Sequence, residues 1–536
     1  MKLNKVFSIF LLVAIFAIGV FLGLIFNENF SDEDRFQSKK FDEVLTFTNK
    51  YYHKETSKEK LVENAIKGML EELDPHSIYI PPQKQAGIAE QLRGQFDGVG
   101  IEYQIIKDTI FVISAIPGGP GEAVGLMPGD RIIKINNKSS IGFSELDVVR
   151  NLRGKKGTSV NITVFRKYSN NIIDFKIIRD IVPLNSVETA IMIDDSIGYI
   201  ILNKFIATST DEVKNALRYL TERGMKKLIL DLRNNPGGYM EQAYEIADLF
   251  ISDNKLLLFT KNRKNEIAAE YKAEIKYPYE NLPLIILVNN GSASSSEILS
   301  GAIQDWDRGL IVGETTFGKG LVQRPFTLED GSVVRLTISK YYTPSGRAIQ
   351  RDYENNPNYF AIVPAQEKEG NNIEHNLETD STDNTFFTRG GRKIKANGGI
   401  TPDYIIKNRE LTYYTILLKS KNLFNRFSIN YLDRNGKELI QKYANNFSDF
   451  QNNFAITRNE MKLFIMFAEA NDVVFAKESF NTDKDYIAYK IKSEIAKNLW
   501  KNEGFYKILL NYDKQFLKAM ELTKQNIKII NGNSKK

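Results

Sequence analysis

The chain has 536 residues, too many for a single hydrophobic core, and its length predicts about three or four domains. Its 42% hydrophobic and 11% aromatic content is typical of a folded globular protein. The net charge of +6 comes without a concentrated basic stripe, so nothing here indicates nucleic-acid binding. The lack of cysteine excludes disulfides, thiolate zinc sites and a cysteine nucleophile.

The N-terminus predicts a membrane-spanning helix. Residues 6–26 are an uncharged run of 21 residues, and about 20 suffice to cross a bilayer. Lys2 and Lys5 precede this run, so the first residues should stay in the cytoplasm and the rest should be exported. A cleaved signal peptide is the alternative, but no small-x-small cleavage site follows Phe26. We therefore expect residues 1–31 to be a cytoplasmic stub and an uncleaved signal anchor.

The spacing of apolar residues predicts a helical region at 32–86. The pattern of short apolar runs and glycine turns predicts a domain of short strands at 87–170. A loop of Gly98, Val99, Gly100 and Ile101 opens one strand, and the run LMPGDRIIKIN (126–136) follows a second tight loop. The glycine loop alone would be only a turn, but this order resembles a PDZ domain. In that fold a peptide adds to the sheet as an extra strand, and backbone N–H groups hold its terminal carboxylate.

Residues 171–408 predict an α/β core, because apolar strands alternate with helices, which is typical of a largely parallel sheet. Residues 353–388 are rich in Asn, Asp, Glu and Thr and are expected to form a solvated insertion. Residues 409–536 predict a C-terminal helical domain, with an apolar stripe that is more typical of packing than of binding.

Ser294 and Lys319 are the most informative pair in the chain. Serine is a weak nucleophile until a neighbouring group takes its proton, and none of the three histidines lies beside a serine-rich turn. Lys319 follows Ser294 by 25 residues and is flanked by glycines. The pair indicates a Ser/Lys hydrolase. The alternative for Ser294 is a helix cap, since Ser294 and Glu297 have the spacing of a capping box.

A second glycine turn, DLRNNPGG (231–238), also lies where a strand meets a helix. The backbone N–H of Gly237 or Gly238 could complete an oxyanion hole with the N–H of Ser295. A purely structural turn is the alternative. The helix that begins near Ser294 adds the positive end of its dipole to the same place.

Lys319 can act as a base only if its pKa falls from about 10.4 to about 7–8. Burial beside apolar groups such as Phe317, away from carboxylates, would lower it. Gln323 could accept a hydrogen bond from the lysine without adding charge. The alternative is an ordinary surface lysine in a glycine loop.

These motifs resemble the signature of C-terminal processing (tail-specific) proteases, which are Ser/Lys peptidases of family S41. The resemblance runs from about residue 40 to 406 and rests on five motifs: GSASSSEI (291–298), VGETTFGKG (312–320) with Gln323, DPHS (74–77), YTPSGR (342–347) and GITPD (399–403). It implies Ser294 as nucleophile, Lys319 as general base and Gln323 as its orienting partner. It also implies a ClpP/crotonase-like core with an inserted PDZ domain that captures the substrate C-terminus. Ser295 stands where alanine is more usual, which leaves its backbone donor intact.

The resulting hypothesis is a membrane-anchored serine endopeptidase on the periplasmic side of a bacterial inner membrane, acting on exported proteins with apolar C-termini. No cofactor or metal is expected, since neither His-Glu-x-x-His nor a phosphate-binding Gly-x-x-x-x-Gly-Lys-Ser/Thr motif occurs. A non-catalytic PDZ scaffold and an acyl-CoA enzyme of crotonase type are the competing functions. The sequence leaves open a homodimer or larger homo-oligomer, an adaptor protein, and release to the periplasm after signal cleavage.

Overall fold

The computed structural model describes residues 32–525, apart from 168–169, 355–358, 361–366, 378–384, 397 and 444. The predicted anchor at 6–26 lies outside these residues, and none of the described helices is long and apolar enough to cross a membrane. The chain forms two compact units. The first ends at Pro81 and includes Pro325–Leu336, and the second comprises Pro82–Arg324 and the chain from Thr337 onward.

The first unit is mainly helical, as predicted. It contains α2 (Asp32–Tyr51) and α3 (Lys58–Glu71), whose N-cap is Ser57. Its short strand β1 (Ile78–Ile80) pairs antiparallel with the start of β18 (Val333–Tyr342). The next helix, α4 (Pro82–Arg93), begins the second unit and runs across the predicted boundary at residue 86.

A seven-stranded sheet forms the centre of the second unit, in the order β10-β11-β12-β15-β16-β22-β19. Its strands are β10 (Val187–Met192), β11 (Ile197–Leu202), β12 (Lys227–Asp231), β15 (Leu284–Val288), β16 (Leu310–Gly313), β22 (Tyr404–Ile405) and β19 (Gly370–Asn371). The strands from β11 to β22 run parallel, whereas β10 and β19 pair antiparallel at the edges. The predicted largely parallel sheet is therefore confirmed.

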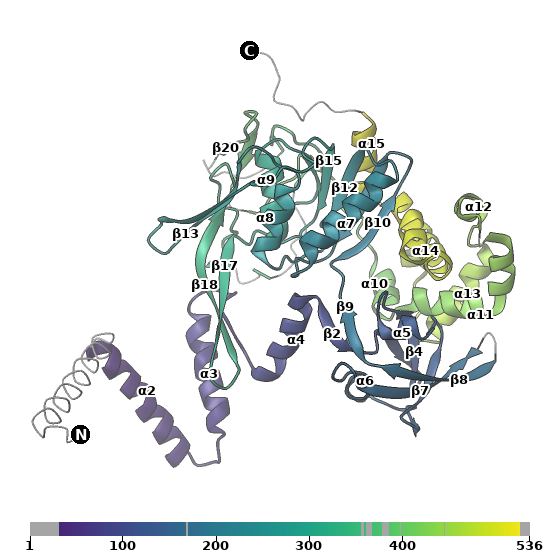
Figure 1. Ribbon diagram of the computed structural model, residues 1–536, viewed down its shortest axis with the longest axis horizontal. Helices are drawn as coiled ribbons and strands as arrows, with labels where there is room; N and C mark the ends of the chain where they lie inside the picture. Colours follow the sequence, from purple (N-terminus) through teal and green to yellow (C-terminus); the bar gives the residue numbers. More distant parts are fainter. Residues whose placement is uncertain are drawn as a thin grey trace, which may run out of the picture. The chain divides into compact units, whose positions relative to one another are not determined.

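Both faces of this sheet are covered, which explains why its strands are continuous apolar runs. One face packs against α7 (Ser209–Glu222), α8 (Met240–Asp248) and α9 (Ser295–Asp305), and Figure 1 shows α8 and α9 side by side. The other face packs against α15 (Lys514–Lys524). The strands β11, β12 and β15 each end at a turn that leads to a helix, and the site described below lies at two of these turns.

Three further strands join β18 in a second sheet. The hairpin of β13 (Leu256–Lys261) and β14 (Ile267–Lys272) pairs with the end of β18. β17 (Leu321–Thr327) also pairs with β18. β17 begins two residues after Lys319 and carries Gln323, so it places both side chains on one short stretch of chain.

The predicted PDZ region forms a separate sheet, in the order β3-β4-β5-β7-β8, with β6 beside β5. Its elements are β3 (Ile101–Ile106), β4 (Thr109–Ala115), α5 (Pro120–Ala123), β5 (Arg131–Ile135), β6 (Lys138–Ser139), α6 (Glu145–Leu152), β7 (Ser159–Arg166) and β8 (Asn171–Ile178). β8 completes a hairpin with β7 beyond residue 170, where we placed the end of the domain. A second pair, β2 (Gln95–Gly98) and β9 (Asp180–Pro183), lies at the ends of this region.

The expectation of a solvated insertion at 353–388 is wrong for part of the segment that the structure describes. Gly370–Asn371 form the edge strand β19 of the central sheet, and Asn372 and His375 are only 1% and 2% exposed. A hairpin of β20 (Thr385–Phe387) and β21 (Lys393–Lys395) follows. Polar composition misled the prediction because these polar groups are buried against one another.

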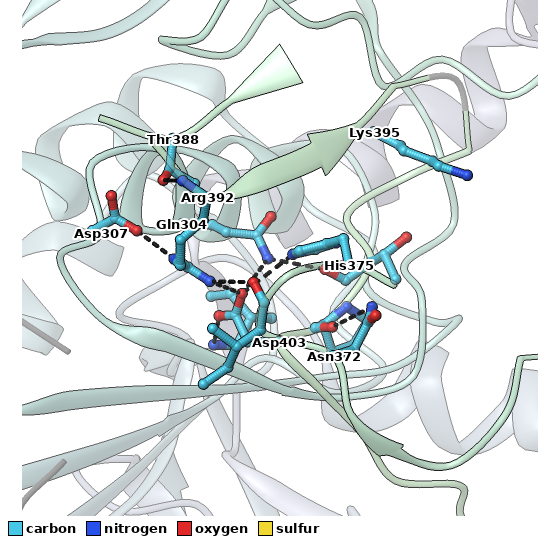
Figure 2. A network of polar contacts seen from close by, with 12 residues as sticks. Gln304, Asp307, Asn372, His375, Thr388, Arg392, Lys395 and Asp403 are labelled. Carbon is cyan, nitrogen blue, oxygen red and sulfur yellow. Dashed lines mark hydrogen bonds and ion pairs between the residues drawn. The ribbon is translucent and has the colours of Figure 1, made fainter. Parts of the chain in front are cut away.

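Figure 2 shows the buried network that holds this segment. Asp403, fully buried, accepts hydrogen bonds from Arg392 at 2.7 Å, Gln304 at 3.1 Å and the Ile311 amide at 2.8 Å. His375 Nε2 lies 3.4 Å from the same carboxylate. Burial disfavours the charged form of Asp403, but the nearby Arg392 and the other donors outweigh it and lower its pKa to about 2.

The C-terminal region is helical as predicted and has its own aromatic-rich core. Its helices are α10 (Tyr413–Ser420), α11 (Leu423–Tyr443), α12 (Phe447–Asn453), α13 (Arg458–Glu469), α14 (Lys477–Leu509), the 3₁₀ turn η2 (Leu510–Tyr512) and α15. The last eleven residues, 526–536, lie outside the described residues.

Candidate active site

Ser294 lies in the turn between β15 and α9, directly before the first helical residue, Ser295. Its backbone has φ 54° and ψ −110°, a conformation that residues other than glycine rarely adopt. Every residue of α9 is buried, so the helix is a fixed support for this turn. The predicted strand–turn–helix setting of Ser294 is therefore present.

A buried carboxylate holds the Ser294 turn against the Lys319 loop. Glu297 is fully buried, and its Oε2 accepts hydrogen bonds from the amides of Ser294 at 2.7 Å and Lys319 at 2.9 Å. Its Oε1 accepts from the amide of Gly318 and the hydroxyl of Thr316, both at 2.6 Å. Burial raises the pKa of Glu297, and these four donors oppose that rise.

Tyr341, on β18, makes a second link between the same two segments. Its hydroxyl lies 3.1 Å from the carbonyl oxygen of Ser294 and 2.7 Å from that of Lys319. Burial, together with nearby Glu297, raises the pKa of this phenol well above its ordinary value, so it remains a donor. Glu297 binds the amides and Tyr341 the carbonyls, so the main chains of Ser294 and Lys319 are fixed at close range.

Lys319 is half-buried, and its Nζ donates to Gln323 Oε1 at 2.8 Å. Gly318, with φ 88°, allows the loop to pass close to Arg351, because a Cβ there would lie 2.9 Å from the Arg351 Cβ. The predicted pairing of Lys319 with the neutral Gln323 is thus seen. A carboxylate does lie in this region, but the bond from Lys319 to Glu297 is made by the backbone amide.

The glycine turn at 231–238 lies against the serine turn. A Cβ on Gly237 would lie 2.9 Å from both Ser294 Cβ and Ser295 N, and one on Gly238 would lie 1.9 Å from the Phe205 carbonyl oxygen. Both glycines have positive φ, 93° and 152°. Only residues without a side chain fit in these two positions.

The two predicted glycine donors differ in their partners. The amide of Gly237 donates to Asn235 Oδ1 at 2.9 Å. No residue within the described part of the chain accepts from the amides of Gly238 or Ser295. Of the two glycines, Gly238 is therefore the one whose N–H remains for an oxyanion beside that of Ser295.

Three asparagines join the two turns. Asn289 Oδ1 accepts from the amide of Asn234 at 2.8 Å, and its Nδ2 donates to Asn234 Oδ1 at 3.0 Å. The carbonyl of Asn235 accepts from the Ser296 hydroxyl at 2.9 Å and from the Ala293 amide at 3.0 Å. These bonds make the serine turn and the glycine turn one rigid assembly.

The predicted peptide-binding loop lies in the PDZ sheet, on elements separate from the serine turn. Gly98 ends β2, and Ile101 begins β3, which is an edge strand of the sheet. Val99 and Gly100 accept bonds through their carbonyls from Gly121 and Ile116, at 2.7 Å and 2.9 Å. The loop is thus braced from behind, and the edge beside it is the place where a strand can add.

Sequence reasoning missed the two residues that do most to unite the site. Glu297 carries a signal, the Ser-x-x-Glu spacing, but that spacing indicates only a helix cap. Tyr341 carries no signal of its own. The asparagines at 234, 235 and 289 lie in the two turns that were singled out, but their mutual bonds join residues about 55 apart in sequence.

Comparisons with known proteins match the chain segment by segment. The model for peptidase family S41 covers residues 196–359, the model for the PDZ domain covers 88–165, and the model for the N-terminal domain of the activating protease CtpB covers 26–83. A family of unknown function covers 413–501. Residues 1–25, 84–87, 166–195, 360–412 and 502–536 lie outside these four matches.

Several similar proteins are named as C-terminal processing proteases. The carboxy-terminal processing protease CtpA of Bacillus subtilis is 35% identical over 356 residues, 65% of this chain and 75% of that protein. A carboxy-terminal-processing protease of Bartonella bacilliformis is 35% identical over 59% of this chain and 73% of its own length. Among solved structures, the photosystem II D1 C-terminal processing protease is 31% identical, covers 58% of this chain and 83% of its own, and has a TM-score of 0.34.

The α/β core, the PDZ domain and these matches together define a serine-type peptidase with a peptide-binding module. The chain belongs to peptidase family S41, among the carboxy-terminal processing proteases. Its PDZ domain binds C-terminal peptides of substrates.

Proposed function

We propose that this chain cleaves exported proteins with apolar C-termini by a Ser294–Lys319 dyad. The neutral amine of Lys319 takes the proton of the Ser294 hydroxyl as Oγ attacks the scissile carbonyl carbon. The lysine then gives that proton to the departing amine, which leaves an acyl-enzyme. A water molecule, deprotonated by the same amine, hydrolyses the ester and restores both groups.

The clamp of Glu297 and Tyr341 is the observation that carries the proposal. A buried ionisable group costs stability, and a simple helix cap would not require one bonded to a loop 22 residues away. The clamp fixes the nucleophile and the base relative to each other, which is what proximity catalysis requires. Gln323 adds an acceptor for Lys319 without the negative charge that would hold the amine protonated.

Stabilisation of the oxyanion falls to the amides of Ser295 and Gly238, with the N-terminus of α9 behind them. We assign Gly237 a different role, because its own amide is bonded to Asn235. It allows the glycine turn to approach the serine turn closely. Removing one donor of such a hole costs about 10²–10³ in kcat in enzymes of this kind.

We place the enzyme at the periplasmic side of a bacterial inner membrane, held by an uncleaved helix at residues 6–26. The PDZ domain captures the substrate tail at the edge of β3, next to the loop from Gly98 to Ile101. The alternative is an enzyme released after signal cleavage. The mass of the protein isolated from membranes distinguishes the two, because cleavage would remove the N-terminal segment.

The test uses the full-length protein in detergent with an unfolded substrate that ends in an apolar tail. Ser294→Ala, Lys319→Ala and Lys319→Arg should each abolish cleavage, because arginine stays protonated. Lys264→Ala, in the exposed turn between β13 and β14, is the matched control and should cleave normally. Full activity in both Lys319 variants would contradict the proposed Ser294–Lys319 dyad.

Membrane topology can be tested directly, because the chain has no cysteine. A single cysteine at position 264 should react with a membrane-impermeant maleimide in cells with a permeabilised outer membrane. A cysteine at position 4 should react only after lysis. The reverse pattern would contradict the orientation.

A further inference from the structure

The C-terminal helical domain contacts the protease core through an apolar interface. Phe516, Ala519 and Leu522 of α15 are buried against one face of the central sheet, and the Phe516 ring lies 5.4 Å from that of Tyr199. Beside them, Arg233 pairs with Asp513 at 2.6 Å. Burial of this kind fixes the domain on the core.

Polar groups link the same domain to the PDZ domain at three points. Asp433 of α11 lies 3.1 Å from Lys167 and 3.6 Å from Arg131. Asn422, just before α11, donates to Gln104 at 3.2 Å. At a third point, Lys501 lies 3.8 Å from Glu122 of α5.

Two of these contacts fall on one row of the PDZ sheet. Gln104 pairs with Phe111, Phe111 with Arg131, and Arg131 with Phe165, so the row crosses β3, β4, β5 and β7. The Arg131 guanidinium lies over the rings of Phe111 and Phe165, at 5.0 Å and 5.8 Å. The row ends on β3, the edge strand where a substrate tail can add.

We propose that the C-terminal helical domain is a brace that fixes the orientation of the PDZ domain over the protease core, with Asp433 and Asn422 as positioning residues. Three separate points fix the orientation of a rigid body, whereas one or two would allow it to pivot. A tail held by a fixed PDZ domain presents the rest of the substrate to the active site at a high effective concentration. The contact with β3 places the brace on the very strand that receives the tail.

The brace is reversible, since its bonds are partly exposed and few. Lys167 is 50% exposed and Asp433 is 17% exposed, so salt screens their attraction. Partly exposed ion pairs shift an equilibrium by only about two- to five-fold each. The interface with the core rests mainly on apolar burial, and its ion pair of Arg233 and Asp513 is less exposed than Lys167, so the PDZ contact is the one that opens first.

The experiment compares Asp433→Lys with wild type and with the charge-swapped variant Asp433→Lys/Lys167→Glu. Glu438→Lys, exposed on the same helix, is the matched control. For cleavage, kcat/KM is measured on one peptide with a free apolar C-terminus and on its amidated form. We expect Asp433→Lys to lower the ratio of the two values at least three-fold at low salt. The swap should restore the ratio in part, because Arg131 still faces the new lysine. In 0.5 M NaCl the difference between Asp433→Lys and wild type should disappear.

A second measurement does not depend on catalysis. Spin labels at Lys176→Cys of β8 and Glu222→Cys of α7, both exposed, report the distance between the PDZ domain and the core in a Ser294→Ala background. Asp433→Lys should broaden the distribution of distances, and the swap should narrow it again.

The inference rests on the proposed function for its cleavage readout alone. If no substrate is cleaved by wild type, the proposed function fails and the distance distributions still decide the brace. An unchanged distribution in Asp433→Lys would overturn the brace, and so would faster cleavage of the tailed peptide, which would make the contact inhibitory.

Discussion

Replacing Glu297 tests whether one carboxylate holds the serine and the lysine together. Each of its oxygens accepts two hydrogen bonds, from Ser294 and Lys319 on Oε2 and from Gly318 and Thr316 on Oε1. Glutamine has one acceptor oxygen, so Glu297→Gln can keep only one of these two pairs. Alanine keeps neither.

The better orientation of the glutamine can be worked out from the donors. If its oxygen replaces Oε2, the bonds to Ser294 and Lys319 remain. The Thr316 oxygen, which already accepts from the Ile400 amide at 2.6 Å, can also accept from the new NH₂ group, so the Gly318 N–H and the Thr316 O–H are the donors that lose their acceptor. A buried unpaired donor costs about 1–3 kcal/mol, which corresponds to about 5- to 150-fold in kcat/KM if the whole cost falls on the transition state.

Glu297→Ala leaves all four donors without the carboxylate, and both turns can separate. We expect no measurable cleavage, since a displacement of about 1 Å can cost 10²-fold. The assay is kcat/KM on a tailed peptide, with Trp306 fluorescence to show that the core is folded. Glu314→Gln, in the same loop as Lys319, is the control. Equal activity in the alanine and glutamine variants would refute the reasoning.

Three further variants test other parts of the site. Gly237→Ala should abolish cleavage, because its Cβ would lie 2.8 Å from a backbone oxygen, whereas Gly346→Ala, with similar φ and open space, should lose only stability in a thermal melt. Tyr341→Phe should lower kcat about 5- to 30-fold with KM unchanged, as one bridging hydroxyl is lost. Asp403 has a pKa lowered from 3.8 to about 2, so its charge stabilises the fold above about pH 4, and this stabilisation disappears as the pH falls toward 2. The stability advantage of wild type over Asp403→Asn should therefore shrink by about 2 kcal/mol in urea unfolding between pH 6 and pH 2, read from Trp306 in a Trp500→Phe background; a constant advantage would contradict it.

Local signals were enough to predict which two turns form the candidate site. The apolar run of β15 followed by a Gly/Ser turn, and that of β12 followed by a Gly-Gly turn, each indicate a strand end that faces a helix start. Because the strands are parallel, both turns come to the same edge of the sheet. The approach of Gly237 to Ser295 follows from that topology.

Non-local bonds could not be predicted. The Ser-x-x-Glu spacing accounts for the bond from Ser294 to Glu297, but not for the bonds to Gly318 and Lys319, which lie 21 and 22 residues beyond the glutamate. The buried segment around His375 was missed for the same reason. Its buried polar groups are stabilised by contacts with Asp403, which lies 28 residues away in sequence from His375. The composition of a segment is a local property, whereas its burial depends on its contacts with distant parts of the chain.

The conformation of Ser294 bears on the choice between helix cap and nucleophile that the sequence left open. Ser57, Ser144 and Thr457 also cap helices in this chain, and all three have extended backbones, with φ from −84° to −74° and ψ from 115° to 168°. Ser294 occupies the same place in its motif at φ 54° and ψ −110°, a region that costs about 1–3 kcal/mol. Capping alone does not require this strain, since the other three caps avoid it. A sharp, strained strand-to-helix turn is the device that exposes a nucleophilic serine above a parallel sheet, and the bonds of Glu297 supply the surroundings that keep it in place, which supports the catalytic interpretation.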